Sequence, residues 1–128
     1  MSNEKKKILI VEDDVFLREL ISRKLVSEGY DIKQASDGED GLRELKNEAP
    51  DLILLDLILP GIDGFEVLMR MKKDSELAHI PIIILSNYIS PEENEEALKL
   101  GALFSLAKPH FMPSEILEII EEVLEERE

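Results

Sequence analysis

Acidic side chains follow two apolar segments of the sequence and could together hold a metal ion. Glu12, Asp13 and Asp14 come directly after one such segment, and Asp56 closes another. A charge at the end of an apolar run is costly unless it is paired or metal-bound, and clustered carboxylates repel one another. Magnesium prefers a few carboxylate oxygens, keeps several waters and commonly bridges to phosphate, whereas calcium needs more protein ligands. These residues therefore predict a magnesium site.

The acidic run at residues 12–14 also has a purely structural explanation. An aspartate just before a helix can cap its N-terminus, so Asp13 or Asp14 could be a cap and the other acids simple loop residues. The run alone does not decide between the two explanations. Asp56 favours the metal site, because it ends the apolar run at residues 52–55.

A hydroxyl and a cation follow two further apolar segments. Ser86 ends the segment that begins at residue 82, and Lys108 follows residues 103–107. A lone serine or lysine at a strand end is usually structural or solvated. Combined with a carboxylate nucleophile and a metal ion, however, they complete the parts of a phosphoryl-transfer site, where catalysis depends on positioning and charge neutralisation.

Alternating apolar and amphipathic segments predict the elements that position these residues. Strands are predicted at Ile8–Val11, Asp31–Ala35, Leu52–Asp56, Ile82–Ser86 and Leu103–Ala107. Helices are predicted at about Val15–Ser27, Gly38–Glu48 behind an Asp37 cap, Phe65–Lys73, from a Ser90 cap to before Gly101, and from Ser114.

Five strand-helix repeats with right-handed crossovers predict an α/β fold. We expect a flavodoxin-like doubly wound (βα)5 three-layer sandwich with parallel sheet order 2-1-3-4-5. In this order the carboxyl ends of the first and third strands lie side by side, which is where a ligand crevice forms.

The composition narrows the class of protein. A chain of 128 residues predicts one domain spanning residues 1–128. The formal net charge of -14 argues against direct nucleic-acid binding, and the lack of cysteine leaves any metal to oxygen ligands. No apolar run reaches the roughly 20 residues of a membrane helix, and no signal peptide precedes the first strand. We therefore expect a cytoplasmic protein without membrane association.

The chain resembles the receiver domain of two-component response regulators over essentially its whole length. The resemblance lies in the stretches ILIVEDD, DLILLDLILPGIDG, PIIILS and GALFSLAKP. It implies a signalling phosphoprotein that takes a phosphoryl group from a histidine kinase or a phosphotransfer protein. Such a protein is not a conventional enzyme, since it catalyses only its own phosphorylation and dephosphorylation. It is a monomer or a phosphorylation-dependent dimer, and its downstream partner stays open.

The resemblance also implies a role for each acidic position. Asp56 matches the phosphoacceptor, which forms an aspartyl phosphate and is also a magnesium ligand. Asp13 matches a direct metal ligand, and Glu12 matches a residue that acts mainly through water. The backbone carbonyl of Ile58 matches the remaining protein ligand.

Two further positions match the groups that hold the phosphoryl group. Ser86 matches the hydroxyl that hydrogen-bonds it, and Lys108 matches the lysine that pairs with it. The resemblance implies a cis bond between Lys108 and Pro109, which costs little before proline. It also implies that a histidine kinase docks near Phe16, Leu17, Pro109 and Phe111, although core packing explains Leu17 equally well.

The sequence departs from the family at the strand that precedes Lys108. Ser105 stands where the family has a Tyr or Phe that moves inward on phosphorylation. Phe104 lies one residue earlier and should point to the opposite face, because side chains alternate along a strand. We therefore expect the surface formed by the fourth helix, fifth strand and fifth helix to respond less to phosphorylation, or to respond by a different route.

Other classes of protein fit these residues less well. A magnesium-dependent phosphatase with an aspartate nucleophile needs a carboxylate two residues later as general acid, and Ile58 occupies that position. The glycine patterns of P-loop hydrolases and dinucleotide-binding domains are absent. The acidic cluster would repel the phosphate of a flavin. An interaction module that keeps the receiver fold but works without phosphorylation stays open, because the switch aromatic is missing.

Overall fold

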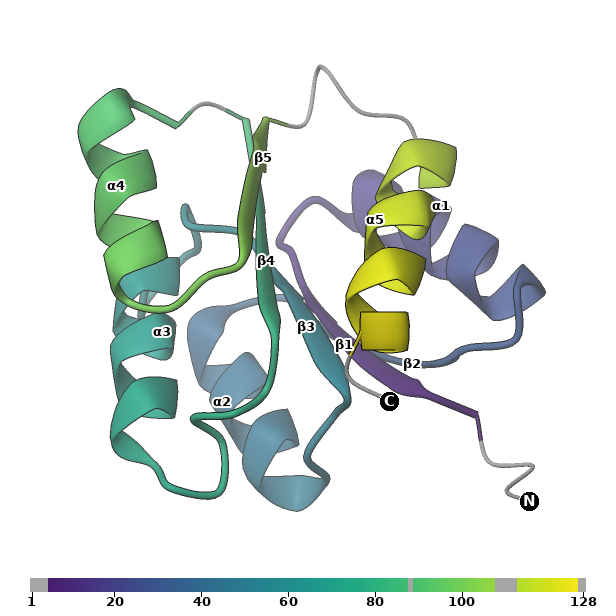
Figure 1. Ribbon diagram of the computed structural model, residues 1–128, viewed down its shortest axis with the longest axis horizontal. Coiled ribbons are helices and arrows are strands. Elements are labelled where there is room, and N and C mark those ends of the chain that lie inside the picture. The colour runs from purple at the N-terminus through teal and green to yellow at the C-terminus, as the bar shows by residue number, and fades with distance from the viewer. Residues whose placement is uncertain (1–4, 88, 108–112, 127–128) are drawn as a thin grey trace.

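Five parallel strands form one sheet at the centre of the structure, in the order β2-β1-β3-β4-β5 (Figure 1). This computed structural model describes residues 5–87, 89–107 and 113–126. The strands are β1 (Lys7–Val11), β2 (Asp31–Ala35), β3 (Leu52–Leu55), β4 (Ile82–Ser86) and β5 (Phe104–Ala107). The helices are α1 (Val15–Ser27), α2 (Gly38–Asn47), α3 (Gly64–Lys73), α4 (Pro91–Lys99) and α5 (Pro113–Glu126). The architecture and strand order confirm the predicted fold.

The sheet separates two layers, each a cluster of buried apolar side chains, with helices on each of its faces (Figure 1). Successive strand residues point to opposite faces, so Leu9 and Val11 join one layer and Ile8 and Ile10 join the other. Helices α2, α3 and α4 cover the first layer, and helices α1 and α5 cover the second. Coverage on both faces explains why β1, β3 and β4 are almost entirely apolar. No helix within the described ranges has the length and apolar character needed to cross a membrane.

Polar side chains fix where the helices begin. Asp14 caps α1, because its Oδ1 accepts a hydrogen bond from the Leu17 amide at 3.1 Å. Asp37 caps α2 and Ser90 caps α4, both as predicted, and Ser90 also forms a reciprocal capping box. The cap of α1 is therefore Asp14, and Asp13 is not needed for this role.

The connection between β3 and α3 differs from the prediction. β3 ends one residue before Asp56, and α3 begins at Gly64 rather than Phe65, behind an Asp63 cap that the sequence analysis missed. A Cβ atom at Gly64 would lie 2.6 Å from the Leu57 Cα and closer still to the Asp56 carbonyl oxygen. Glycine therefore lets the start of α3 approach the backbone that carries Asp56.

Four other element ends differ from the predicted ends by a single residue, because backbone hydrogen bonding rather than the apolar pattern sets them. The observed ends are Lys7, Asn47, Phe104 and Pro113.

Candidate functional site

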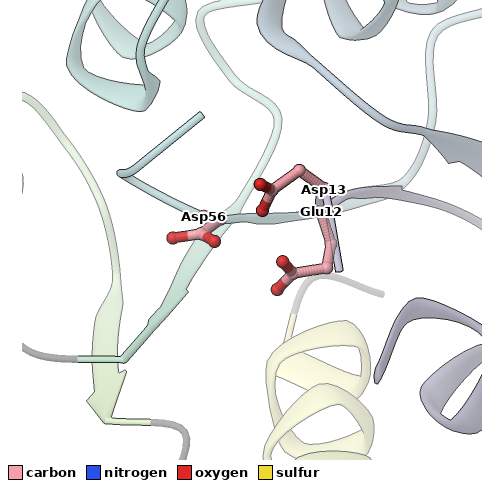
Figure 2. A group of neighbouring side chains, drawn as sticks. All are labelled: Glu12, Asp13 and Asp56. Atoms are coloured by element: carbon pink, nitrogen blue, oxygen red, sulfur yellow. The ribbon is translucent and has the colours of Figure 1, made fainter. Parts of the chain in front are cut away.

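Three carboxylates meet at the carboxyl edge of the sheet. Glu12 and Asp13 follow β1, Asp56 follows β3, and one carboxylate oxygen from each lies within 4.8 Å of the others (Figure 2). Glu12 and Asp56 are only 3% and 4% exposed, while Asp13 is open to solvent. The sequence analysis predicted this convergence from the adjacency of the two strands.

Backbone hydrogen bonds hold the two acidic segments in register. The Asp56 amide donates to the Val11 carbonyl at 3.1 Å, which continues the β1–β3 ladder by one residue. The Glu12 amide donates to the Ala35 carbonyl at 3.0 Å and so continues the β1–β2 ladder. The acids thus extend from the sheet itself rather than from long loops, which limits their freedom.

The Asp56 carboxylate accepts hydrogen bonds from two described groups. Ser86 at the end of β4 is 0% exposed, and its Oγ donates to Asp56 Oδ1 at 2.8 Å. The Ile58 amide donates to the same oxygen at 3.1 Å. The structure thereby brings Ser86, predicted from sequence, into direct contact with the predicted acceptor.

Glu12 is tied to the turn that leads into α1. Its Oε2 accepts a hydrogen bond from the Asp14 amide at 3.0 Å. Its backbone carbonyl accepts one from Arg18 Nη1 at 2.6 Å, and Arg18 Nε donates to Gln34 Oε1 at 2.9 Å. The sequence alone predicted no role for Arg18 or Gln34. The available signal was a cation four residues after Asp14, one helical turn beyond the acidic run.

The chemistry of these donors fits a hard divalent cation. Glu12, Asp13 and Asp56 offer only oxygen atoms, and two of the three carboxylates are buried. Buried carboxylates in close contact repel each other strongly, and a divalent cation offsets that repulsion. Magnesium suits the set better than calcium, since three carboxylates leave room for water and a phosphoryl oxygen.

For several predicted site residues, no contact with the acidic cluster is described. Lys108, Pro109 and Phe111 lie outside the described residues, as does the predicted cis bond between the first two. The role of the Ile58 carbonyl stays a prediction, while the Ile58 side chain is 63% exposed. Phe16 on α1 is 79% exposed, which agrees with its predicted place on the surface.

The fifth strand confirms the predicted directions of Phe104 and Ser105. Phe104 pairs with Ile83, which belongs to the layer beneath α1 and α5, whereas Ser105 pairs with Ile84 of the opposite layer. The Ser105 Oγ is buried and has no hydrogen-bond partner in the described part of the chain. No aromatic side chain of this strand therefore faces the α4 layer.

A separate surface hollow of about 300 Å³ lies between α2 and α3. Its apolar lining residues are Leu42, Ile62 and Leu77. Two of its rim cations are already paired, Arg43 with an aspartate at 3.0 Å and Arg70 with a glutamate at 2.9 Å. The acidic cluster, unlike this hollow, combines buried carboxylates with a buried hydroxyl in direct contact, so the cluster is the stronger candidate site.

The sequence and structure both match known proteins. A family model for the response regulator receiver domain matches residues 8–121. Sporulation initiation phosphotransferase F of Bacillus subtilis (strain 168) is 41% identical over 124 residues, covering 97% of this chain and 96% of that protein. The DNA-binding dual master transcriptional regulator RpaA of Synechocystis is 39% identical over 103 residues, covering 80% of this chain and 43% of that protein. The crystal structure of a CheY-like response regulator receiver domain protein from Methanospirillum hungatei JF-1 aligns with a TM-score of 0.89 at 33% identity, covering 96% of each chain.

These matches define the class of protein. The chain belongs to the response regulator receiver domains of two-component systems, a family whose members act as signalling phosphoacceptors. It spans about half the length of several curated relatives that it matches. The departure at Ser105 is thus a difference within the family, not an argument against membership.

Proposed function

We propose that Asp56 accepts a phosphoryl group in a magnesium-dependent reaction and that this modification is the signal the domain carries. The observation that carries the proposal is the position of the Asp56 carboxylate. It lies 2.8 Å from the Ser86 hydroxyl and within reach of the Glu12 and Asp13 carboxylates. Among the described acids of this edge, it is the buried one that also contacts a buried hydroxyl.

The donor that we propose is the phosphohistidine of a histidine kinase or a phosphotransfer protein. A carboxylate oxygen of Asp56 attacks phosphorus, the new O–P bond forms, and the P–N bond to the histidine breaks. The leaving imidazole nitrogen takes up a proton from solvent. Water later attacks the same phosphorus, releasing inorganic phosphate and restoring the Asp56 carboxylate.

The chain's own residues would orient the acceptor and neutralise charge. Glu12, Asp13 and Asp56 would hold the magnesium ion, which when bound offsets the negative charge of the phosphoryl oxygens. The Ser86 hydroxyl, now donating to Asp56, would donate to a phosphoryl oxygen instead. Lys108 is proposed to pair with another phosphoryl oxygen, as the family resemblance implies.

Intact-mass measurement after incubation with a small phosphodonor tests the proposal. We expect one phosphoadduct in the presence of magnesium, none after chelation, and none in Asp56→Asn. Asp63→Asn is the matched control, because Asp63 is an aspartate outside the cluster and asparagine caps helix α3 equally well. An adduct that forms without magnesium, or that survives in Asp56→Asn, would overturn the proposal.

A second candidate function is a protein-interaction module that keeps the fold and works without phosphorylation. Ser105 favours it, because a buried hydroxyl without a described partner replaces the usual aromatic. The same mass measurement separates the two functions, since an interaction module needs no adduct at Asp56.

A further inference from the structure

Arg18 connects the turn between β1 and α1 to strand β2. Its Nη1 donates to the backbone carbonyl of Glu12 at 2.6 Å, and its Nε donates to Gln34 Oε1 at 2.9 Å. Both hydrogen bonds are partly buried. A planar guanidinium can bridge two acceptors in one fixed geometry, which the single ammonium of lysine does less well.

The carbonyl that Arg18 holds belongs to a residue fixed at several of its atoms. The Glu12 amide is bound to the Ala35 carbonyl at 3.0 Å, and the Glu12 Oε2 accepts from the Asp14 amide at 3.0 Å. The Glu12 carbonyl belongs to the peptide group that joins Glu12 to Asp13. The direction of the Glu12 carbonyl therefore helps set where both acidic side chains of the pair can point.

We propose that Arg18 is a positioning residue for the magnesium site and that Gln34 orients its guanidinium. This inference rests on the proposed function, because it concerns the same three carboxylates. Arg18 does not hydrogen-bond to the carboxylates of the cluster. Its side-chain hydrogen bonds within the described ranges go to the backbone carbonyl of Glu12 and to the side-chain amide oxygen of Gln34. Groups that orient metal ligands from behind typically change metal affinity by about 10–100-fold when they are removed.

The direction in which magnesium affinity changes when Arg18 is replaced distinguishes a positioning role from simple charge repulsion. A positive charge beside a cation site repels the cation, so removing a cation that acts only by charge would tighten magnesium binding. Removing a cation that orients the ligands weakens binding instead. Loss of Gln34 provides a second test, since it leaves the Arg18 charge in place and removes only its orientation.

Isothermal titration calorimetry of the full chain with magnesium chloride measures whether each substitution raises or lowers the magnesium Kd. We expect Arg18→Met to raise the magnesium Kd about 10-fold and Gln34→Leu to raise it by a smaller factor. Arg43→Met is the matched control, because it also removes one cation, exposed on α2 and paired with Asp40. Its Kd should equal that of the unmodified chain.

A second readout distinguishes positioning from a general loss of structure. In Arg18→Met, the magnesium concentration for half-maximal phosphoadduct formation should rise, while the rate at saturating magnesium returns toward that of the unmodified chain. Thermal melting in chelator checks the fold of each variant. If Arg18→Met melts below the assay temperature, Arg18→Lys and Gln34→Leu give the result, since each makes a smaller change.

Equal or tighter magnesium binding in folded Arg18→Met, with Gln34→Leu unchanged, would overturn the positioning role. If the unmodified chain binds magnesium and forms the adduct while the variants bind equally well, this inference alone fails. If the unmodified chain binds no magnesium, the proposed function fails first, and the positioning role fails with it.

Discussion

The central strands of the sheet and the edge beside them differ in how completely they are buried. Every residue of β3 and β4 is buried, and these strands lead to Asp56 and Ser86. At the edge, β5 buries only Leu106 and α4 buries only Ala97. A continuous apolar core therefore holds Asp56, the proposed acceptor, while few buried side chains hold the neighbouring strand and helix.

On the proposed function, the groups for phosphoryl transfer lie in the buried region, and the elements that would report it lie in the less buried one. The Asp56–Ser86 contact depends on the register of the buried strands β3 and β4. The edge carries Ser105, where the family resemblance implies an aromatic, and has a capping box at the start of α4. We therefore expect substitutions in β5 or α4 to leave the Asp56–Ser86 contact in place.

The largest expected contrast between the central strands and the edge is the loss of unfolding free energy when one side chain is truncated. Ile84→Ala removes a side chain that is 0% exposed in β4, so we expect the free energy of unfolding to fall by about 2–5 kcal/mol. Phe104→Ala removes a side chain that is 37% exposed in β5, and we expect a loss of about 1 kcal/mol. Urea denaturation measures both. Equal losses would show that the edge is packed as firmly as the centre.

The hydroxyl of Ser86 should matter more for rate than for stability. Ser86→Ala removes the group that contacts Asp56, so we expect phosphoadduct formation to slow by about 100-fold. Ser27→Ala is the control, because Ser27 donates only to a backbone carbonyl at the exposed end of α1. Time-resolved mass spectrometry gives the rates, and an unchanged rate in Ser86→Ala would remove Ser86 from the mechanism.

The response of α4 to a phosphoryl mimic should be small. Since Ser105 offers no aromatic to move toward the site, we expect beryllofluoride to change hydrogen exchange at Pro91–Lys99 only slightly. Ser105→Tyr should enlarge that change by supplying the aromatic. A full rearrangement of α4 in the unmodified chain would contradict the small response expected here.

The smallest expected effect concerns the Ser105 hydroxyl itself. Because this buried hydroxyl has no partner among the described groups, Ser105→Ala should raise the free energy of unfolding by up to about 1 kcal/mol. Ser90→Ala, which removes the α4 cap, should lower it by about 1 kcal/mol. Thermal denaturation distinguishes the two signs. A loss of stability in Ser105→Ala would mean that the hydroxyl is satisfied after all.

The sequence predicted the fold class, the strand order and the edge at which the acids converge. Those features depend on local periodicity and on the few topologies open to a repeated strand-helix unit, so neighbouring residues suffice to predict them. The placement of Asp56 and Ser86 at adjacent strand ends followed directly. The Asp63 cap was missed although an aspartate followed three residues later by Glu66 is a local cap signature. Only the close approach of Gly64 to the Asp56 backbone needed the tertiary structure.

The sequence by itself determined which residue types reach the carboxyl edge of the sheet, but not which atoms meet there. Only the tertiary structure decided that Asp14 caps α1, that Ser86 donates to Asp56, and that Arg18 holds the Glu12 carbonyl. The last two contacts join different secondary-structure elements. Their geometry depends on strand register, helix orientation and side-chain rotamers together, and no local pattern encodes all three.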